Sequence, residues 1–165
     1  MAKSFKGDDD LLVIGYGNTL RQDDQAGPAV AELIESRALP RVRTIACAQL
    51  SPEHAEDVAR CGMVVFVDAQ ARQDGGIVFE EVIAGESSQV TTHAVKPQTL
   101  LALARDVYGW TSKAWLLTIP ADRFGFGEEL SPLARRGIQM AVERIVSLAT
   151  VDRIERTAQR SNCAW

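Results

Sequence analysis

Residues 11–34, LLVIGYGNTLRQDDQAGPAVAELI, constrain the fold more than any other part of the chain. An apolar run breaks at Gly15 and Gly17, a polar turn carries the adjacent acids Asp23 and Asp24, and a helix opens directly afterwards. This order predicts a strand, a loop and a helix. The start of a helix attracts anions, but here the chain supplies its own carboxylates. The loop is therefore better suited to a cation than to a phosphate.

The remainder of the chain alternates between short apolar runs and amphipathic segments, which is typical of an α/β fold. Ser-Pro pairs at Ser51 and Ser131 mark two of the helix starts. We expect strands at residues 11–15, 42–48, 63–69, 76–83 and 114–119, and helices at residues 28–37, 52–60, 97–108 and 132–148. On the helices, we expect Leu33 and Val107 to face the core.

The expected fold is one three-layer domain with a mostly parallel five-stranded sheet and helices on both faces. Residues 70–75 are too few for the crossover that a parallel connection needs, so the fourth strand is expected to be antiparallel and at an edge. Right-handed crossovers place the first strand between the second and the third.

Length and composition limit the classes of function. The 165 residues, 46% of them hydrophobic, suit a single domain over residues 1–165, with 1–10 and 151–165 as loose tails. The net charge of -4 and the absence of a basic stripe argue against nucleic acid, and no apolar run approaches the ~20 residues of a membrane span. Three cysteines without a CxxC pair and no apolar leader indicate a cytoplasmic protein. A monomer is expected.

Three residues are candidates for chemistry. Asp24 follows the first strand and Asp68 ends the third, so both are expected at the crevice where ligands bind open α/β sheets. His93 lies in a polar segment, residues 84–96, that is long enough to reach this crevice. Two carboxylates and one imidazole suit a divalent ion such as zinc, nickel or iron, and three ligands leave coordination positions open.

Each of these residues also has an ordinary structural explanation. A strand-end aspartate such as Asp68 commonly caps the loop that follows it, and a loop histidine such as His93 is commonly solvated. Asp23 and Asp24 fit a solvated acidic pair at a helix start, although Asp23 can take that structural role while Asp24 faces the crevice. His54, the second histidine, is expected at the surface of a helix.

Other chemistries find less support in the sequence. The turn GYGNTL has Leu20 where a dinucleotide fingerprint has its third glycine, and the acids that follow it would repel a pyrophosphate. An enzyme that uses a nucleotide remains an alternative. The sequence contains no GxSxG elbow, so a hydrolase of this kind would use water or a metal.

The ordered set of motifs resembles the hydrogenase maturation endopeptidases. The motifs are the turn Gly15-Tyr16-Gly17-Asn18, the acidic pair Asp23-Asp24, the apolar strand that ends in Asp68, and His93 ahead of a helix. The segments QLSPE at 49–53 and FGFGEELS at 124–131 resemble the branch that serves soluble hydrogenases. The similarity covers roughly residues 11–148.

The resemblance implies a function. Members of this family remove a C-terminal extension from the precursor of the nickel–iron hydrogenase large subunit, after nickel has been inserted. It implies that Asp24, Asp68 and His93 contact the nickel and serve in catalysis. The nickel is supplied by the precursor, so no tightly bound cofactor of the chain's own is expected. The segments at 49–53 and 124–127 are candidate contacts with the precursor.

The sequence leaves the mechanism open. The metal could polarise the scissile carbonyl or activate water, or Asp24 or Asp68 could act as a general base while the ion serves recognition. A nickel metallochaperone or assembly factor without proteolytic activity, using the same three residues, is the alternative function.

Overall fold

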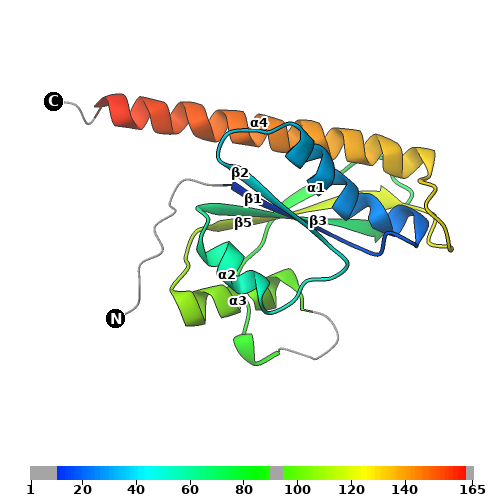
Figure 1. The fold of residues 1–165 in the computed structure, drawn as a ribbon, viewed down its shortest axis with the longest axis horizontal. Helices are drawn as coiled ribbons and strands as arrows, with labels where there is room; N and C mark the ends of the chain where they lie inside the picture. Colours follow the sequence, from blue (N-terminus) through cyan, green and yellow to red (C-terminus); the bar gives the residue numbers. More distant parts are fainter. Residues whose placement is uncertain (1–10, 90–94, 163–165) are drawn as a thin grey trace.

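The computed structural model describes residues 11–89 and 95–162. Its centre is a five-stranded sheet with the order β2-β1-β3-β5-β4 (Figure 1). Strands β2, β1, β3 and β5 are parallel, and β4 pairs with β5 in the antiparallel sense. The predicted fold class is confirmed, including the central position of the first strand and the antiparallel edge strand.

Apart from the end of the last helix, the element bounds lie close to those expected from the sequence. The strands are β1 (Leu11–Tyr16), β2 (Val42–Cys47), β3 (Met63–Ala71), β4 (Val78–Glu81) and β5 (Lys113–Ala121). The helices are α1 (Ala26–Ser36), α2 (His54–Ala59), α3 (Pro97–Tyr108) and α4 (Pro132–Asn162), with short 3-10 turns η1 (Gln22–Gln25) and η2 (Ser87–Gln89).

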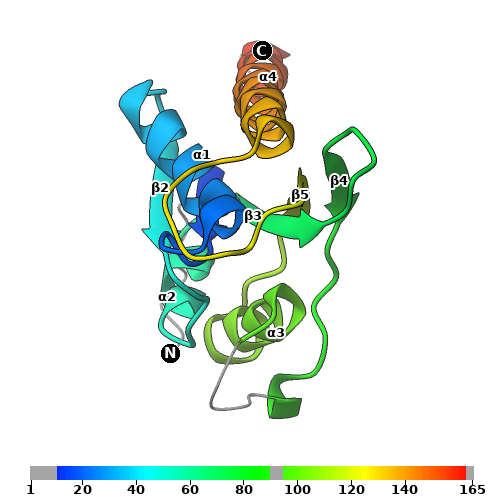
Figure 2. The same cartoon turned by 90° about the vertical axis from the view of Figure 1, so that its right-hand side faces the viewer.

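Two helical layers enclose the sheet, with α1 and α4 on one face and α2 and α3 on the other (Figure 2). Alternate residues of each strand feed the two layers, as the pleat of a sheet requires. Leu12, Ile14 and Phe66 belong to the hydrophobic cluster beneath α2 and α3. Val13 and Val65 belong to the cluster beneath α1 and α4. The chain therefore has two cores that share one sheet.

Several local expectations were wrong. Helix α4 does not end near Leu148 but continues to Asn162, because no glycine or proline follows Gly137 to interrupt it. Leu33 and Val107 were expected to face the core, yet 45% and 64% of their surfaces are exposed. The apolar stripes of α1 and α3 are narrower than the sequence pattern suggested. Helix α2 starts at His54, two residues later than expected.

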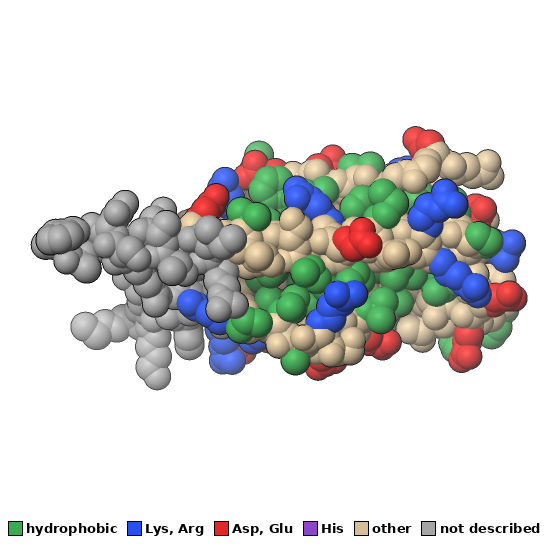
Figure 3. Space-filling model, turned by 90° about the horizontal axis from the view of Figure 1, so that it is seen from above, with side chains coloured by type: hydrophobic (Ala, Val, Ile, Leu, Met, Phe, Trp, Pro, Cys, Tyr) green, Lys and Arg blue, Asp and Glu red, His purple; other side chains and the backbone are tan. Residues whose placement is uncertain are grey.

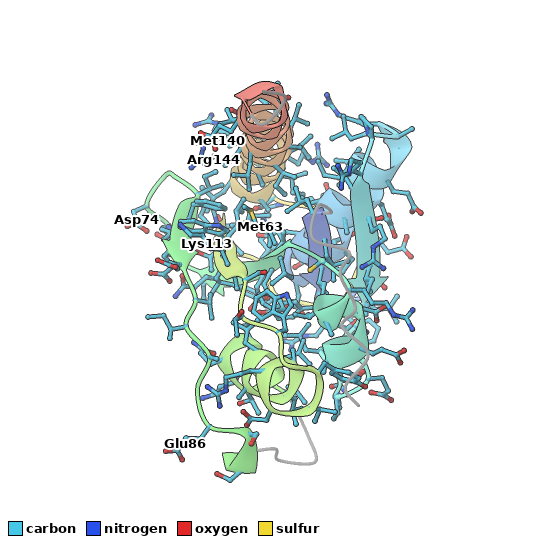
Figure 4. The ribbon with its side chains drawn as sticks, turned by 90° about the vertical axis from the view of Figure 1, so that its left-hand side faces the viewer. Met63, Asp74, Glu86, Lys113, Met140 and Arg144 are labelled. Carbon is cyan, nitrogen blue, oxygen red and sulfur yellow. The ribbon has the colours of Figure 1, made fainter. Side chains whose placement is uncertain are left out.

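Because β2, β1, β3 and β5 are parallel, all four begin at one edge of the sheet and end at the opposite edge. Figure 4 looks at the edge where the parallel strands begin, with Met63 and Lys113 opposite each other at the starts of β3 and β5. The antiparallel strand β4 is held to the α4 layer by Phe79, whose ring stacks on Trp115 at 4.9 Å and lies 4.6 Å from the Arg144 guanidinium carbon. The parallel strands end at the other edge, which faces the viewer in Figure 2. Asp68 lies near the end of β3, and Asp24 lies in the loop that follows β1.

The face formed by α1 and α4 has mixed charge. Figure 3 shows acidic and basic side chains dispersed among apolar ones over this face, without a large area of one sign.

Candidate functional site

Two glycines allow the end of β1 to lie directly against the start of α1. A Cβ on Gly15 would lie 2.0 Å from the Gly27 carbonyl oxygen, and a Cβ on Gly27 would lie 2.4 Å from that of Tyr16. Both distances are far shorter than any real contact, so neither position accepts a side chain. The close approach brings the loop between β1 and α1 over the carboxyl edge of the sheet.

A third glycine shapes the loop itself. Gly17 has a φ of +151°, and a Cβ there would lie 1.9 Å from the Asp24 carbonyl oxygen. The Asn18 N–H donates to Asp24 Oδ2 at 2.8 Å, while Asn18 Oδ1 accepts from the Leu20 N–H at 2.9 Å. These contacts hold the Asp24 carboxylate at the end of β1, partly exposed to solvent.

Asp23 points the opposite way and is completely buried. Its carboxylate accepts hydrogen bonds from the N–H groups of Asp122 and Arg123, both at 3.0 Å. It also accepts from the N–H and hydroxyl of Ser131, at 2.8 and 2.7 Å. Burial acts to raise the pKa of Asp23, but these hydrogen bonds outweigh it and hold the pKa below its usual value. Asp23 is a structural residue.

Asp68 lies beside the end of β1. Gly15 is opposite Val67 in the sheet, so Tyr16 and Asp68 follow at one level and on the face covered by α2 and α3. Their side chains share a hydrogen bond, which the Tyr16 hydroxyl donates. The same register places Cys47 beyond Tyr16 on β2 and Thr118 beyond Asp68 on β5. The sheet thus ends, on this face, in a row of four groups that can form hydrogen bonds.

The electrostatics of the site favour proton exchange at Asp68. Burial, together with the nearby charge of Asp24, raises the pKa of Asp68 to about 6, even though hydrogen bonds from the Ala69 N–H and from Tyr16 act in the opposite direction. Burial, with the charge of Asp68, raises the pKa of Tyr16 well above its usual value, so the phenol remains protonated. A carboxyl group that titrates near pH 6 is suited to act as a general base or acid.

His93 lies outside the described residues, and its predicted approach to Asp24 and Asp68 stays a prediction. The structure does fix both flanks of its segment. The Gly85 N–H donates to the Gln98 carbonyl at 3.0 Å, in the first turn of α3. Val95, two residues after His93, is buried in the cluster against which Tyr16 packs.

His54 has a local role. Its Nδ1 accepts a hydrogen bond from the Ser51 N–H at 3.0 Å, and the side chain is half-buried. The ring therefore stabilises the turn that leads into α2. His54 was expected at the surface, but it is half-buried and hydrogen-bonded.

The structure brings together two of the three predicted site residues. Asp24 and Asp68 interact electrostatically at the carboxyl ends of β1 and β3. Within residues 11–89 and 95–162, no group of three or more His, Cys, Asp or Glu side chains is arranged to hold a metal ion. Tyr16 was missed as a site residue, although the register of β1 against β3 could have placed it beside Asp68.

No protein-family model and no curated protein matches this chain. Solved structures do. The match to the [NiFe] hydrogenase maturation protease HycI from Thermococcus kodakarensis covers 91% of this chain and 96% of that protein, with 23% identity and a TM-score of 0.66. The maturating endopeptidase HybD from Escherichia coli covers 84% and 91%, with 19% identity and a TM-score of 0.61. A hydrogenase 2 maturation peptidase from a Thaumarchaeota archaeon has 24% identity, 84% and 97% coverage and a TM-score of 0.62.

The chain has the hydrogenase maturation protease fold. The fold that the sequence resemblance implied is thereby confirmed, and it extends over nearly the whole length of these proteins. None of the helices in the described part of the chain combines the length and hydropathy that a membrane span requires.

Proposed function

We propose that this chain is an endopeptidase that removes the C-terminal extension of a nickel–iron hydrogenase large-subunit precursor after nickel insertion. The observation that carries the proposal is the pair Asp24 and Asp68 at the carboxyl ends of neighbouring strands, in a fold shared with maturation proteases. Open α/β sheets bind their ligands at this edge. This pair and the fold support a peptidase, and the sequence resemblance supports the recognition of nickel.

In this proposal the nickel arrives with the substrate. Asp24, Asp68 and His93 contact the ion, which the precursor already holds, and thereby complete its coordination. A precursor without nickel lacks that binding free energy and dissociates uncut. An open pair of carboxylates suits this role, because a complete set of protein ligands would bind free metal instead. The ion can polarise the scissile carbonyl, and cleavage then needs no nucleophilic side chain from the protein.

Asp68 is the better placed of the two acids to move a proton. Without a bound ion the pKa of Asp68 is about 6, which suits a group that accepts and releases a proton near neutral pH. The Tyr16 hydroxyl donates to its carboxylate and so fixes the orientation of the accepting oxygen. Asp24 accepts from the Asn18 N–H and keeps its other oxygen for the ion.

Mass spectrometry of the nickel-loaded precursor after incubation with the purified chain tests the proposal. We expect the precursor to lose the mass of its C-terminal extension. Asp24→Ala, Asp68→Ala and His93→Ala should each leave it uncut, whereas Glu80→Ala, at an exposed position of β4, should not. A wild-type protein that binds the precursor and leaves its mass unchanged would favour a metallochaperone. Normal cleavage by all three variants would refute the site.

A further inference from the structure

The loop of residues 122–131, between β5 and α4, wraps around the start of α1 (Figure 2). Besides the four hydrogen bonds to Asp23, backbone bonds join it to the segment 20–25. The Gln22 N–H donates to the Gly127 carbonyl at 2.7 Å, and the Gly127 N–H donates to the Leu20 carbonyl at 2.8 Å. Side chains add three more: Gln25 to the Glu128 carbonyl, Arg21 to the Phe124 carbonyl, and the Gly125 N–H to Gln22.

Two large apolar side chains of these hydrogen-bonded loops are exposed to solvent. Phe126 is 90% exposed and Leu20 is 50% exposed. The bond between Gly127 and Leu20 places their backbones side by side. An exposed phenyl ring on a mobile tail would need no explanation, but this one is carried by a backbone that is hydrogen-bonded on both sides of it.

The pair lies next to the candidate site. Leu20 donates its N–H to Asn18 Oδ1, and the Asn18 N–H donates to Asp24 Oδ2. A continuous run of hydrogen bonds therefore connects the Phe126 loop to the site carboxylate, through Leu20 and Asn18. Any polypeptide that presents a bond or an ion to Asp24 comes within reach of this apolar pair.

We propose that Phe126, with Leu20, is the docking anchor for the protein substrate of the Asp24–Asp68 site. The inference rests on the proposed function, because it takes the substrate to be a folded protein. A side chain that is 90% exposed protrudes, so its partner must supply the pocket, which a protein surface can do and a small molecule cannot. Aromatic side chains dominate interface energetics, and a loop ordered in advance loses little entropy on binding.

The test compares four proteins with the nickel-loaded large-subunit precursor from the same organism as the probe. Cleavage kinetics and the dissociation constant are measured for wild type, Phe126→Ala, Phe126→Trp and Val107→Ala. Val107 is a matched control, since it is 64% exposed and lies at the end of α3 that leads into the start of β5, away from the site. Phe126→Ala removes a side chain that is 90% exposed, so the variant should fold.

We expect Phe126→Ala to raise KM and the dissociation constant at least tenfold while kcat stays within twofold. Phe126→Trp and Val107→Ala should match wild type.

If wild type cleaves and Phe126→Ala binds within twofold of it, the anchor is refuted while the proposed function stands. If wild type does not cleave, the dissociation constants still decide: a tenfold loss on Phe126→Ala supports the anchor, and no binding by wild type refutes it. A wild-type dimer that dissociates on Phe126→Ala would assign the pair to a second copy and also refute the proposal.

Discussion

At the scale of the residue, Asp23 and Asp24 are neighbours with opposite environments. Asp23 is completely buried and accepts four hydrogen bonds, whereas Asp24 is partly exposed and receives one from Asn18. The sequence allowed either a solvated pair or a structural Asp23 beside an Asp24 that faces the crevice. Asp23 is the structural residue, because its hydrogen bonds join the loop after β1 to the loop before α4. Its hydroxyl partner, Ser131, also accepts from the Ala134 N–H and so caps α4.

Replacing Asp23 should destabilise the fold much more than replacing its neighbour. Asp23→Ala leaves the buried N–H group of residue 131 and the part-buried N–H groups of residues 122 and 123 without their acceptor, so we expect a loss of about 3 kcal/mol in the free energy of unfolding. Asp24→Ala removes one partly exposed hydrogen bond and should cost about 1 kcal/mol. Urea denaturation measures both values, and equal losses would contradict the assignment.

The same residue predicts a pH dependence of stability. The pKa of Asp23 is lower in the folded state than in the unfolded chain, so the unfolded state binds the proton more readily. Its contribution to stability is therefore complete above about pH 4 and is lost as the pH falls through the folded-state value. We expect the urea midpoints of wild type and Asp23→Ala to converge as the pH falls below 4. A difference that persists unchanged at pH 2 would contradict this.

At the scale of the element, the contact between β1 and α1 depends on the absence of side chains. Gly15 and Gly27 let the strand and the helix approach until backbone atoms touch. This approach fixes where the loop with Asp24 lies relative to Asp68 on the next strand. Packing between two elements, rather than the loop sequence alone, sets the geometry of the site.

A methyl group at Gly27 should disrupt this contact. Its Cβ would lie 2.4 and 2.5 Å from two backbone oxygens, which cannot yield as a flexible side chain would. We expect Gly27→Ala to cost about 3 kcal/mol in the free energy of unfolding, as overpacking of a rigid core does. Gly75→Ala, in the β3–β4 turn where a Cβ meets nothing within 4 Å, should change stability by less than about 0.5 kcal/mol. Chemical denaturation of both variants provides the comparison, and similar values would argue against a backbone clash.

Sequence patterns predicted the elements well and their exposed faces less well. Helix α3 has the bounds expected, 97–108, because local backbone preferences set both ends. Pro97 lies in its first turn, and Gly109 follows its last residue in the left-handed conformation. Leu33 and Val107 have the helical spacing of core residues but lie beyond the area that the sheet and neighbouring helices cover. The extent of that cover is a tertiary property that one helix does not encode.

At the scale of the whole molecule, one sheet serves two hydrophobic layers. Residues such as Leu100 on α3 are buried against one face, and Ile145 on α4 is buried against the other. Because β1, β3 and β5 contribute alternate residues to both layers, neither layer can separate without disrupting the strands that support the other.

Truncation in either layer should therefore destabilise the entire domain. We expect Leu100→Ala and Ile145→Ala each to cost about 3 kcal/mol, as large-to-small changes at fully buried positions do. Unfolding should stay a single transition, with circular dichroism and tryptophan fluorescence coinciding. Trp110 lies in one layer and Trp115 packs against the other, so separate midpoints would reveal independent layers.

The candidate site was only partly predictable from the sequence. Asp24 and Asp68 could be placed because strand ends of a parallel sheet meet at one edge, and topology alone brings them together. The burial of Asp23 could not, since its partner Ser131 is 108 positions away. Tyr16 appeared to be only part of a glycine turn, and its hydrogen bond to Asp68 depends on the register of two strands.

Mass spectrometry of nickel-loaded and nickel-free precursor, each incubated with the chain, decides whether cleavage depends on nickel. We expect the chain to remove the C-terminal extension from the nickel-loaded form and to leave the nickel-free form intact. Equal cleavage of both forms, or an intact precursor in both, would contradict this expectation.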